Sequence, residues 1–118
     1  MSVRGDIERR LMSIPGLTPR ESRYGHGLAF YVGRREVVHF HGDQRMDVRL
    51  TVGVIQLRWR EDRLDDRVTP EGGAPNWVKV RLSEARDVVL AVVLAEEAVR
   101  ANARGSTTPF RTSGRRVA

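Results

Sequence analysis

The chain has no cysteine, one lysine and no long apolar run. Without a thiol it cannot form a disulfide bond, a thiolate zinc site, an iron–sulfur cluster or a cysteine nucleophile. Its longest uninterrupted apolar run, residues 88–95, is far shorter than the roughly 20 residues of a membrane-spanning helix. The first residues include Asp6 and Glu8 and no apolar stretch, so no signal peptide is expected. These features predict a cytoplasmic protein with no membrane segment.

The composition is that of a folded protein with an uneven distribution of charge. The 118 residues are 40% hydrophobic and 31% charged, which suits one domain with a real core. The formal charge is +6, but residues 104–118 contain four arginines and no acid. The sequence therefore predicts a single domain over residues 1–103 and a basic, disordered tail over 104–118. That tail either follows the phosphates of a nucleic acid or is a solvated end.

Hydrophobic periodicity predicts an α+β fold. Ile7, Leu11 and Ile14 recur at helical spacing, and alternation of apolar and polar residues marks the strands. The expected elements are a helix at 5–14, a loop at 18–27, strands at 28–32, 36–41 and 47–51, a helix at 52–62, a connection at 63–76, a strand at 77–82 and a helix at 84–103. Their order, α-β-β-β-α-β-α, predicts an antiparallel meander of four or more strands with helices packed on one face.

The two long helices carry further expectations. Thr51 is expected to cap the helix at 52–62, with Val54 and Ile55 inward and Leu57 and Trp59 as further inward candidates. Ser83 is expected to cap the last helix, with Glu84 and Asp87 in its first turn. The middle of that helix is apolar nearly all round, so it is either largely buried or meets a second subunit. A homodimer is therefore one candidate assembly.

Alternation also assigns the two faces of the sheet. We expect Phe30 to pair with Val38 and Val48 with Phe40, which places His41 opposite Asp47. The same register places His39 opposite Arg49. The core face then carries Leu28, Phe30, Val32, Val38, Phe40, Val48 and Leu50, and the other face carries Ala29, Tyr31, Val37, His39, His41, Asp47, Arg49, Thr51, Trp77, Lys79 and Arg81.

The polar face gathers residues with several kinds of chemistry. His39 and His41 point the same way, and His26 precedes the first strand at a position from which it could approach His41. Together with Asp47 these side chains could hold zinc or a non-haem metal ion, with His26, His39 and His41 as the candidate ligands. Alternatively, Asp47 orients His41 as a general base, with His39 beside it, although no serine or cysteine nucleophile lies nearby.

Other interpretations of the same face involve neither a metal ion nor a catalysed reaction. Tyr31, Trp77 and the histidine rings could stack on a ligand while Arg49, Lys79 and Arg81 meet its negative charge. The same face could instead pack on a protein partner, or stand in water with its histidines in ordinary cross-strand pairs. Nothing in the sequence indicates a cofactor.

Part of the chain resembles a family of small bacterial proteins and fungal domains labelled "luciferase domain". The matching segments are His26-Gly27, Phe30-x-Val32, Gly33-Arg34-x-Glu36-Val37-x-His39-Phe40-His41, Asp47-Val48-Arg49-Leu50-Thr51, a looser Asp66-Arg67 pair and Trp77-Val78-x-Val80. The resemblance covers about half of the chain and implies no particular reaction. The order of elements is also similar to that of MmcQ/YjbR-type domains, some of which are catalogued as DNA-binding.

Taken together, these patterns favour a small binding module that uses the open sheet face for a ligand or a protein partner. The first alternative is a histidine-dependent enzyme, metal-assisted or not, at His26, His39, His41 and Asp47. The second is an accessory nucleic-acid binder that uses Arg49, Lys79, Arg81 and the tail.

Overall fold

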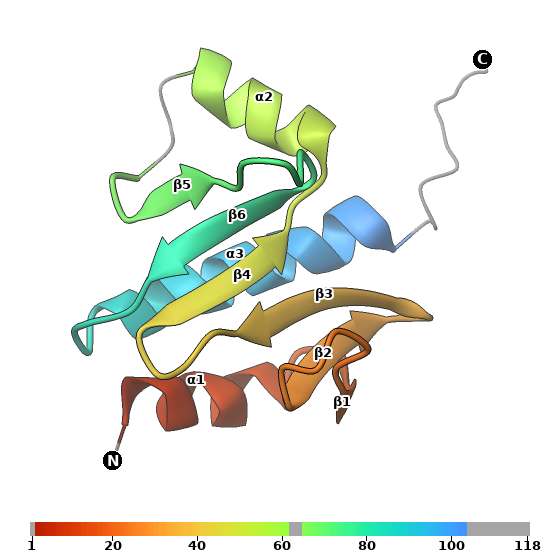
Figure 1. The fold of residues 1–118 in the computed structure, drawn as a ribbon, viewed down its shortest axis with the longest axis vertical. Coiled ribbons are helices and arrows are strands. Elements are labelled where there is room, and N and C mark those ends of the chain that lie inside the picture. Colours follow the sequence, from red (N-terminus) through yellow and green to blue (C-terminus); the bar gives the residue numbers. More distant parts are fainter. Residues whose placement is uncertain (1, 62–64, 104–118) are drawn as a thin grey trace.

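The computed structural model describes residues 2–61 and 65–103 of the chain (Figure 1). The predicted tail, 104–118, therefore lies outside the described residues. The elements in chain order are α1 (Val3–Leu11), β1 (Thr18–Glu21), β2 (Leu28–Val32), β3 (Arg35–Phe40), β4 (Arg45–Arg49), α2 (Val52–Arg60), β5 (Val68–Pro70), β6 (Trp77–Arg81) and α3 (Asp87–Asn102).

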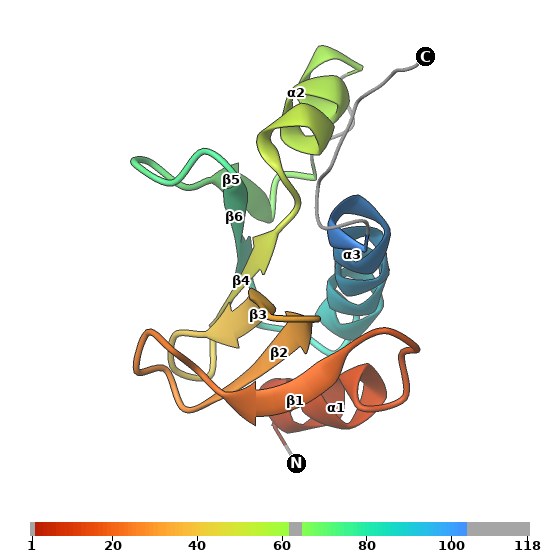
Figure 2. The same ribbon diagram turned by 90° about the vertical axis from the view of Figure 1, so that its right-hand side faces the viewer.

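The strands form one antiparallel sheet in the order β1-β2-β3-β4-β6-β5. Helix α3 packs on β3 and β4, and α1 packs beside α3, so these helices cover the same side of the sheet (Figure 2). This arrangement confirms the predicted α+β class. The core lies between these layers, and its fully buried side chains include Ile7, Leu11, Phe30, Val38, Phe40, Met46, Val48, Val78, Val80 and Ala95.

Two strands lie in segments that were predicted to be irregular. Strand β1 occupies the first part of the expected loop at 18–27 and pairs with β2 along its whole length. Its four residues are exposed and polar or proline, so they show no apolar alternation by which a strand could be recognised. Strand β5, in the expected connection at 63–76, pairs with β6 at the edge of the sheet.

The pairing of β3 with β4 differs from the predicted register by two residues. Val38 lies opposite Val48 and His39 lies opposite Asp47, so the expected pairs of His39 with Arg49, His41 with Asp47 and Phe40 with Val48 are wrong. The His41 amide donates to the carbonyl oxygen of Arg45 at 2.9 Å, which makes the turn shorter than expected. A shift of two residues keeps every side chain on its face, because side chains alternate with period two.

The pairing of β2 with β3 contains an irregularity that alters one face. Phe30 pairs with Val38 as predicted, but the next pair is Tyr31 with Glu36, so Val37 is an extra residue. A β-bulge of this kind interrupts the alternation of side chains. Val37 is fully buried in the hydrophobic core, and its predicted place on the polar face is wrong.

The two later helices confirm one expectation and correct others. Thr51 caps α2 as predicted, accepting from the Val54 amide at 3.5 Å. Ile55 is buried, but Leu57 and Trp59 are exposed, so their expected inward positions are wrong. Helix α3 begins at Asp87, three residues later than expected, and Ser83 is not its N-cap.

The start of α3 is held by an acid. The carboxylate of Asp87 accepts from the amides of Ser83 and Glu84 at 2.7 and 2.8 Å and pairs with Arg67. One side of the helix is buried, but Val89 and Val93 are exposed, so the expected burial of its middle nearly all round is wrong; contact with a second subunit stays a prediction.

Candidate functional site

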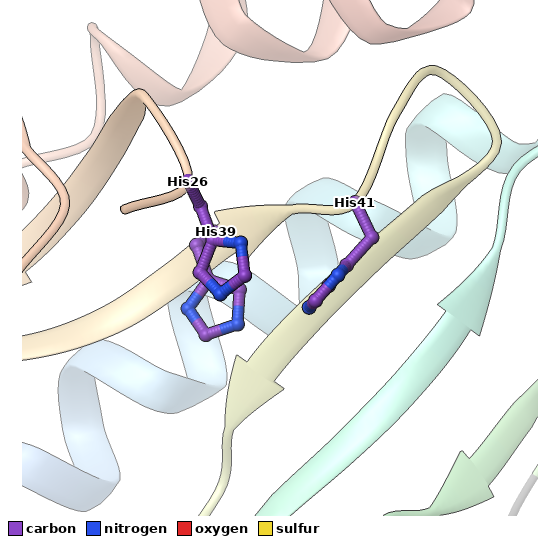
Figure 3. A group of neighbouring side chains, drawn as sticks. All are labelled: His26, His39 and His41. Atoms are coloured by element: carbon purple, nitrogen blue, oxygen red, sulfur yellow. The ribbon is translucent and has the colours of Figure 1, made fainter. Parts of the chain in front are cut away.

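Three histidines converge on the side of the sheet away from α1 and α3 (Figure 3). His39 lies on β3, His41 follows the end of β3, and His26 reaches them from the loop between β1 and β2. The ring centroid of His26 lies 4.3 Å from that of His39 and 4.2 Å from that of His41. This confirms the predicted approach of His26 to His41. One ligand nitrogen from each ring lies within 4.8 Å of the others.

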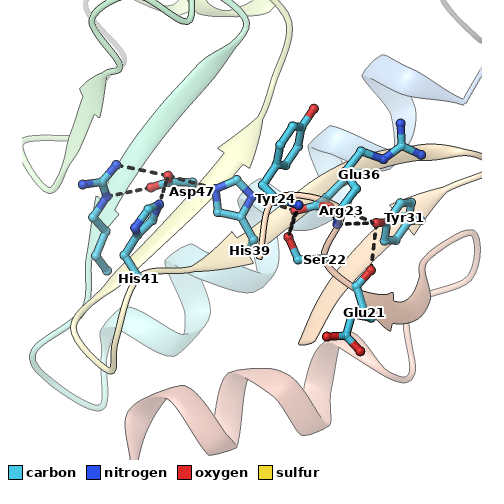
Figure 4. Close-up of polar contacts among 10 residues, drawn as sticks. Glu21, Ser22, Arg23, Tyr24, Tyr31, Glu36, His39, His41 and Asp47 are labelled. Atoms are coloured by element: carbon cyan, nitrogen blue, oxygen red, sulfur yellow. Dashed lines mark hydrogen bonds and ion pairs between the residues drawn. The ribbon is translucent and has the colours of Figure 1, made fainter. Parts of the chain in front are cut away.

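His39 is held between two carboxylates (Figure 4). Its Nδ1 lies 2.9 Å from Oε2 of Glu36, and its Nε2 lies 3.1 Å from Oδ2 of Asp47. All three side chains are buried, with only 3% of Glu36, 7% of His39 and 4% of Asp47 exposed. Both nitrogens of this ring therefore face negatively charged oxygens away from bulk water.

Glu36 is fixed by a set of donors around its carboxylate. Its Oε1 accepts from the Arg23 amide and from the Tyr31 hydroxyl, each at 2.9 Å. Its Oε2 accepts from the Ser22 hydroxyl at 2.8 Å as well as facing His39. Burial alone would raise the pKa of Glu36, but these hydrogen bonds outweigh it and lower the pKa. Glu36 is therefore an ionised acceptor that several hydrogen bonds hold against Nδ1 of His39.

Asp47 joins the second nitrogen of His39 to His41. Its Oδ2 lies 2.9 Å from Nε2 of His41, and Arg45 donates to both carboxylate oxygens at 2.8 and 3.1 Å. Burial would raise the pKa of Asp47, but the bonds from His39 and Arg45 and the charge of Arg45 lower it to about 2. Oδ2 of Asp47 is thus the point on which two imidazole nitrogens converge.

A neutral His39 ring can donate to only one of the two carboxylates that it contacts. A neutral imidazole has one N–H group and one lone pair. When Nδ1 of His39 donates to Glu36, Nε2 turns its lone pair toward Oδ2 of Asp47, and the two atoms repel each other. A proton or a metal ion between them removes that repulsion and also neutralises buried negative charge.

The spacing of these atoms suits a metal ion. Bonds from zinc to histidine nitrogen or carboxylate oxygen are about 2.0–2.2 Å long, so neighbouring ligands of a tetrahedral ion lie roughly 3.3–3.6 Å apart. The two distances from Oδ2 of Asp47, 3.1 Å to His39 and 2.9 Å to His41, are somewhat shorter, so small side-chain rotations would admit the ion. His26 offers a ring nitrogen within 4.8 Å of those of His39 and His41 and is a candidate for a further ligand. Its pKa is lowered by burial and by the neighbouring His39 and His41, which favours the neutral, ligating imidazole.

The other residues predicted for this face do not form one open surface. Tyr31 is buried, and its hydroxyl donates a hydrogen bond to Glu36, so it stabilises the cluster and is not exposed to a ligand. Trp77 is partly buried, and its ring lies 4.8 Å from that of His39. Lys79 pairs with Glu71 at 3.7 Å. Arg81 is exposed. Arg49, the last residue of β4, donates to Asn102 at the end of α3.

Sequence reasoning missed the residues that support the histidines. Ser22 and Arg45 carry no signal in the pattern, but Glu36 does, since it stands where strict alternation expects an apolar core residue beside Val38 and Phe40. A charged residue at such a position indicates either a break in the alternation or a buried polar site. Here it indicates both.

Of the helices in the described part of the chain, none has the length and apolar character needed to cross a membrane. Comparisons with protein-family models, curated proteins and solved structures find no match. The resemblance to the luciferase-domain family stays a prediction.

Proposed function

We propose that this chain is a small ligand-binding domain that holds one divalent transition-metal ion between His39, His41 and Asp47, with His26 as a fourth ligand. The observation that carries the proposal is the convergence of Nε2 of His39 and Nε2 of His41 on Oδ2 of Asp47. Imidazole and carboxylate ligands together suit zinc, iron(II) or manganese(II).

The contact between Glu36 and His39 supports this assignment. Histidines that bind metals commonly donate their other ring N–H to a carboxylate, which fixes the tautomer and makes the ligating nitrogen more basic. Glu36 stands in that position 2.9 Å from Nδ1 of His39, and three further donors hold it there. The bulge that brings Glu36 to this face thus places a hydrogen-bond acceptor against Nδ1 of His39.

The function that follows is binding at the metal ion. The side chain of His41 is 36% exposed, so the cluster is reached from solvent on its His41 side. A metal with three or four protein ligands can offer a further position to a water molecule or to a ligand with a donor atom. Such an ion can also activate the bound water, which keeps the enzymatic alternative within the same site.

A second candidate function requires no metal. Arg45 donates to both oxygens of Asp47, so this carboxylate already has a cationic partner. With a proton on each nitrogen of His39, the Glu36–His39–Asp47 chain would be a buried relay that supports His41 as a general acid or base. The nucleic-acid alternative receives less support, because Lys79 is paired with Glu71 and Arg49 lies at the other end of the face.

Calorimetric titration of the full chain, purified without a histidine tag, separates these candidates. We expect one equivalent of Zn2+, Co2+ or Mn2+ to bind saturably to the chelator-treated protein. His41→Ala and His26→Ala should each weaken binding at least 10-fold, while the exposed control Arg81→Ala should leave it unchanged. Absence of saturable binding by all these ions and by Fe2+ to a folded protein would overturn the metal assignment and favour the relay.

A further inference from the structure

A second candidate site lies beside the histidine cluster. A cleft of about 650 Å3 opens between the turn from β2 to β3, the loop after β1 and the end of α3. Four of its lining residues are arginines, namely Arg23, Arg34, Arg35 and Arg49. A volume of this size is typical of sites for small molecules.

The lining of the cleft contains four arginines and one acid. Glu36 is the single acid among the lining residues of the described chain, and its oxygens already accept from Ser22, Arg23, Tyr31 and His39. Arg23 donates to the carbonyl oxygen of Arg34 at 2.6 Å. Among the described residues, no carboxylate pairs with the side chain of Arg34 or Arg49.

Arg49 lines the cleft with a neutral hydrogen-bond partner. Within the described residues its guanidinium has no carboxylate partner and donates to the neutral amide oxygen of Asn102. Its pKa is lowered, first by burial and then by the charge of Arg35. Asn102 is itself held by the carbonyl oxygens of Ala98 and Arg49 at 2.7 and 2.9 Å. Arg49 is thus a positioned cation with most of its N–H donors uncommitted.

Two aromatic side chains complete the lining. Trp77 and Tyr24 both border the cleft, and Trp77 also contacts the ring of His39. Guanidinium groups bind carboxylate and phosphate oxygens in a planar, bidentate manner, whereas aromatic rings stack on flat groups. Both kinds of contact are available within one cleft.

We propose that this cleft binds a small organic anion in which a phosphate or carboxylate group is attached to a flat ring. The anionic group lies between Arg34 and Arg49, and the ring packs against Trp77. A polymer is a poorer fit, because Arg45 and Lys79 on the same side of the sheet are paired with Asp47 and Glu71 and provide no continuous basic track. The proposal does not depend on the metal ion.

The fluorescence of Trp77 provides a direct test. The chain has two tryptophans, and Trp59 lies on α2 with 66% of its surface exposed, so Trp59→Phe leaves Trp77 as the single reporter. In this background we would titrate the full chain with phenyl phosphate, benzoate, inorganic phosphate and, as a neutral control, benzyl alcohol. Phenyl phosphate or benzoate should give a saturable change, inorganic phosphate a weaker affinity and benzyl alcohol none.

Substitutions then locate the anion. Arg34→Ala, at an exposed turn, and Arg49→Gln should each reduce the affinity for phenyl phosphate about 10-fold. Arg81→Ala should not change it, and zinc binding should be unaltered in all three proteins. An affinity for phenyl phosphate that is unchanged from the Trp59→Phe background in both the Arg34 and the Arg49 variant would overturn the proposal, as would no response to either aryl anion.

Two further outcomes would also contradict it. Equal affinity for inorganic phosphate and phenyl phosphate would show that the ring makes no contact. Tighter binding of a single-stranded oligonucleotide, with an affinity that falls steeply with salt, would replace the small anion by nucleic acid. Loss of anion binding with retained zinc binding, or the reverse, separates this proposal from the metal assignment.

Discussion

Glu36 and His39 make direct contact through Oε2 and Nδ1, 2.9 Å apart, although they are three positions apart on one strand. In a regular strand, residues three apart point to opposite faces of the sheet. The bulge at Val37 removes that opposition, since Tyr31 pairs with Glu36 while Phe30 pairs with Val38. One irregular residue therefore places the acid against the imidazole.

The first prediction concerns the stability that Glu36 provides. In Glu36→Gln, one oxygen of the carboxylate becomes an NH2 group that faces donors, so the buried network loses acceptors and charge. We expect a loss of about 2–4 kcal/mol in the free energy of unfolding, measured by urea denaturation. The matched control is Glu21→Gln on the exposed strand β1, which should change it by less than about 0.5 kcal/mol. Equal effects would show that the network is not stabilising.

The second prediction concerns acid unfolding through Asp87. Burial would raise its pKa, but the amides of Ser83 and Glu84 and the Arg67 side chain lower it from 3.8 to about 2. Because the unfolded chain binds the proton more tightly, this contribution is complete above pH 3.8 and is lost as the pH falls through 2. It amounts to roughly 2 kcal/mol.

Asp87→Asn isolates that contribution. The variant should be less stable than the wild type at pH 6, and the difference between the two should shrink by roughly 2 kcal/mol as the pH falls to 2. Chemical denaturation at several pH values measures both curves. A difference that stays constant across this range would show that Asp87 does not titrate with a lowered pKa.

The third prediction concerns backbone strain at Thr51. This residue has φ of 75°, the only positive value among the described residues other than glycine. Such a conformation costs about 1–3 kcal/mol for a side chain with a Cβ atom. Because both variants lose the capping hydroxyl, Thr51→Gly should be more stable than Thr51→Ala by about 1 kcal/mol in thermal or urea unfolding.

A control at Gln56 within α2 should show the opposite sign. There glycine should be less stable than alanine by about 1 kcal/mol, because the helix interior penalises glycine. If alanine is also the better residue at position 51, the positive φ stores no strain in the folded chain.

Alternation of apolar and polar residues predicts which face of the sheet a side chain occupies, but not which residue it pairs with. Alternation places Val78, Val80 and Leu82 in the core, and all three are buried. It also brings His39, His41 and Asp47 to one face, and an error of two residues in register leaves them there. Period-two patterning specifies the face of a strand more strongly than the partner of each residue.

The support of the histidine cluster depends on features without a periodic signal. Ser22 and Arg23 reach Glu36 from a polar loop, and strand β1 beside them consists of exposed residues. The bulge at Val37 is a local backbone event that follows from packing Val37 and Glu36 into different surroundings. The sequence predicts which histidines gather, whereas only tertiary packing shows what holds them.

The most direct test of the central claim follows the protons on the imidazole nitrogens. We would label histidine with 15N in the full chain and record the ring signals before and after one equivalent of zinc. The account predicts that Nδ1 of His39 stays protonated toward Glu36, while Nε2 of His39 and of His41 take on the shifts of metal-bound nitrogen. If both nitrogens of His39 keep their protons in excess zinc, the cation between His39 and Asp47 is a proton, and the metal assignment is wrong.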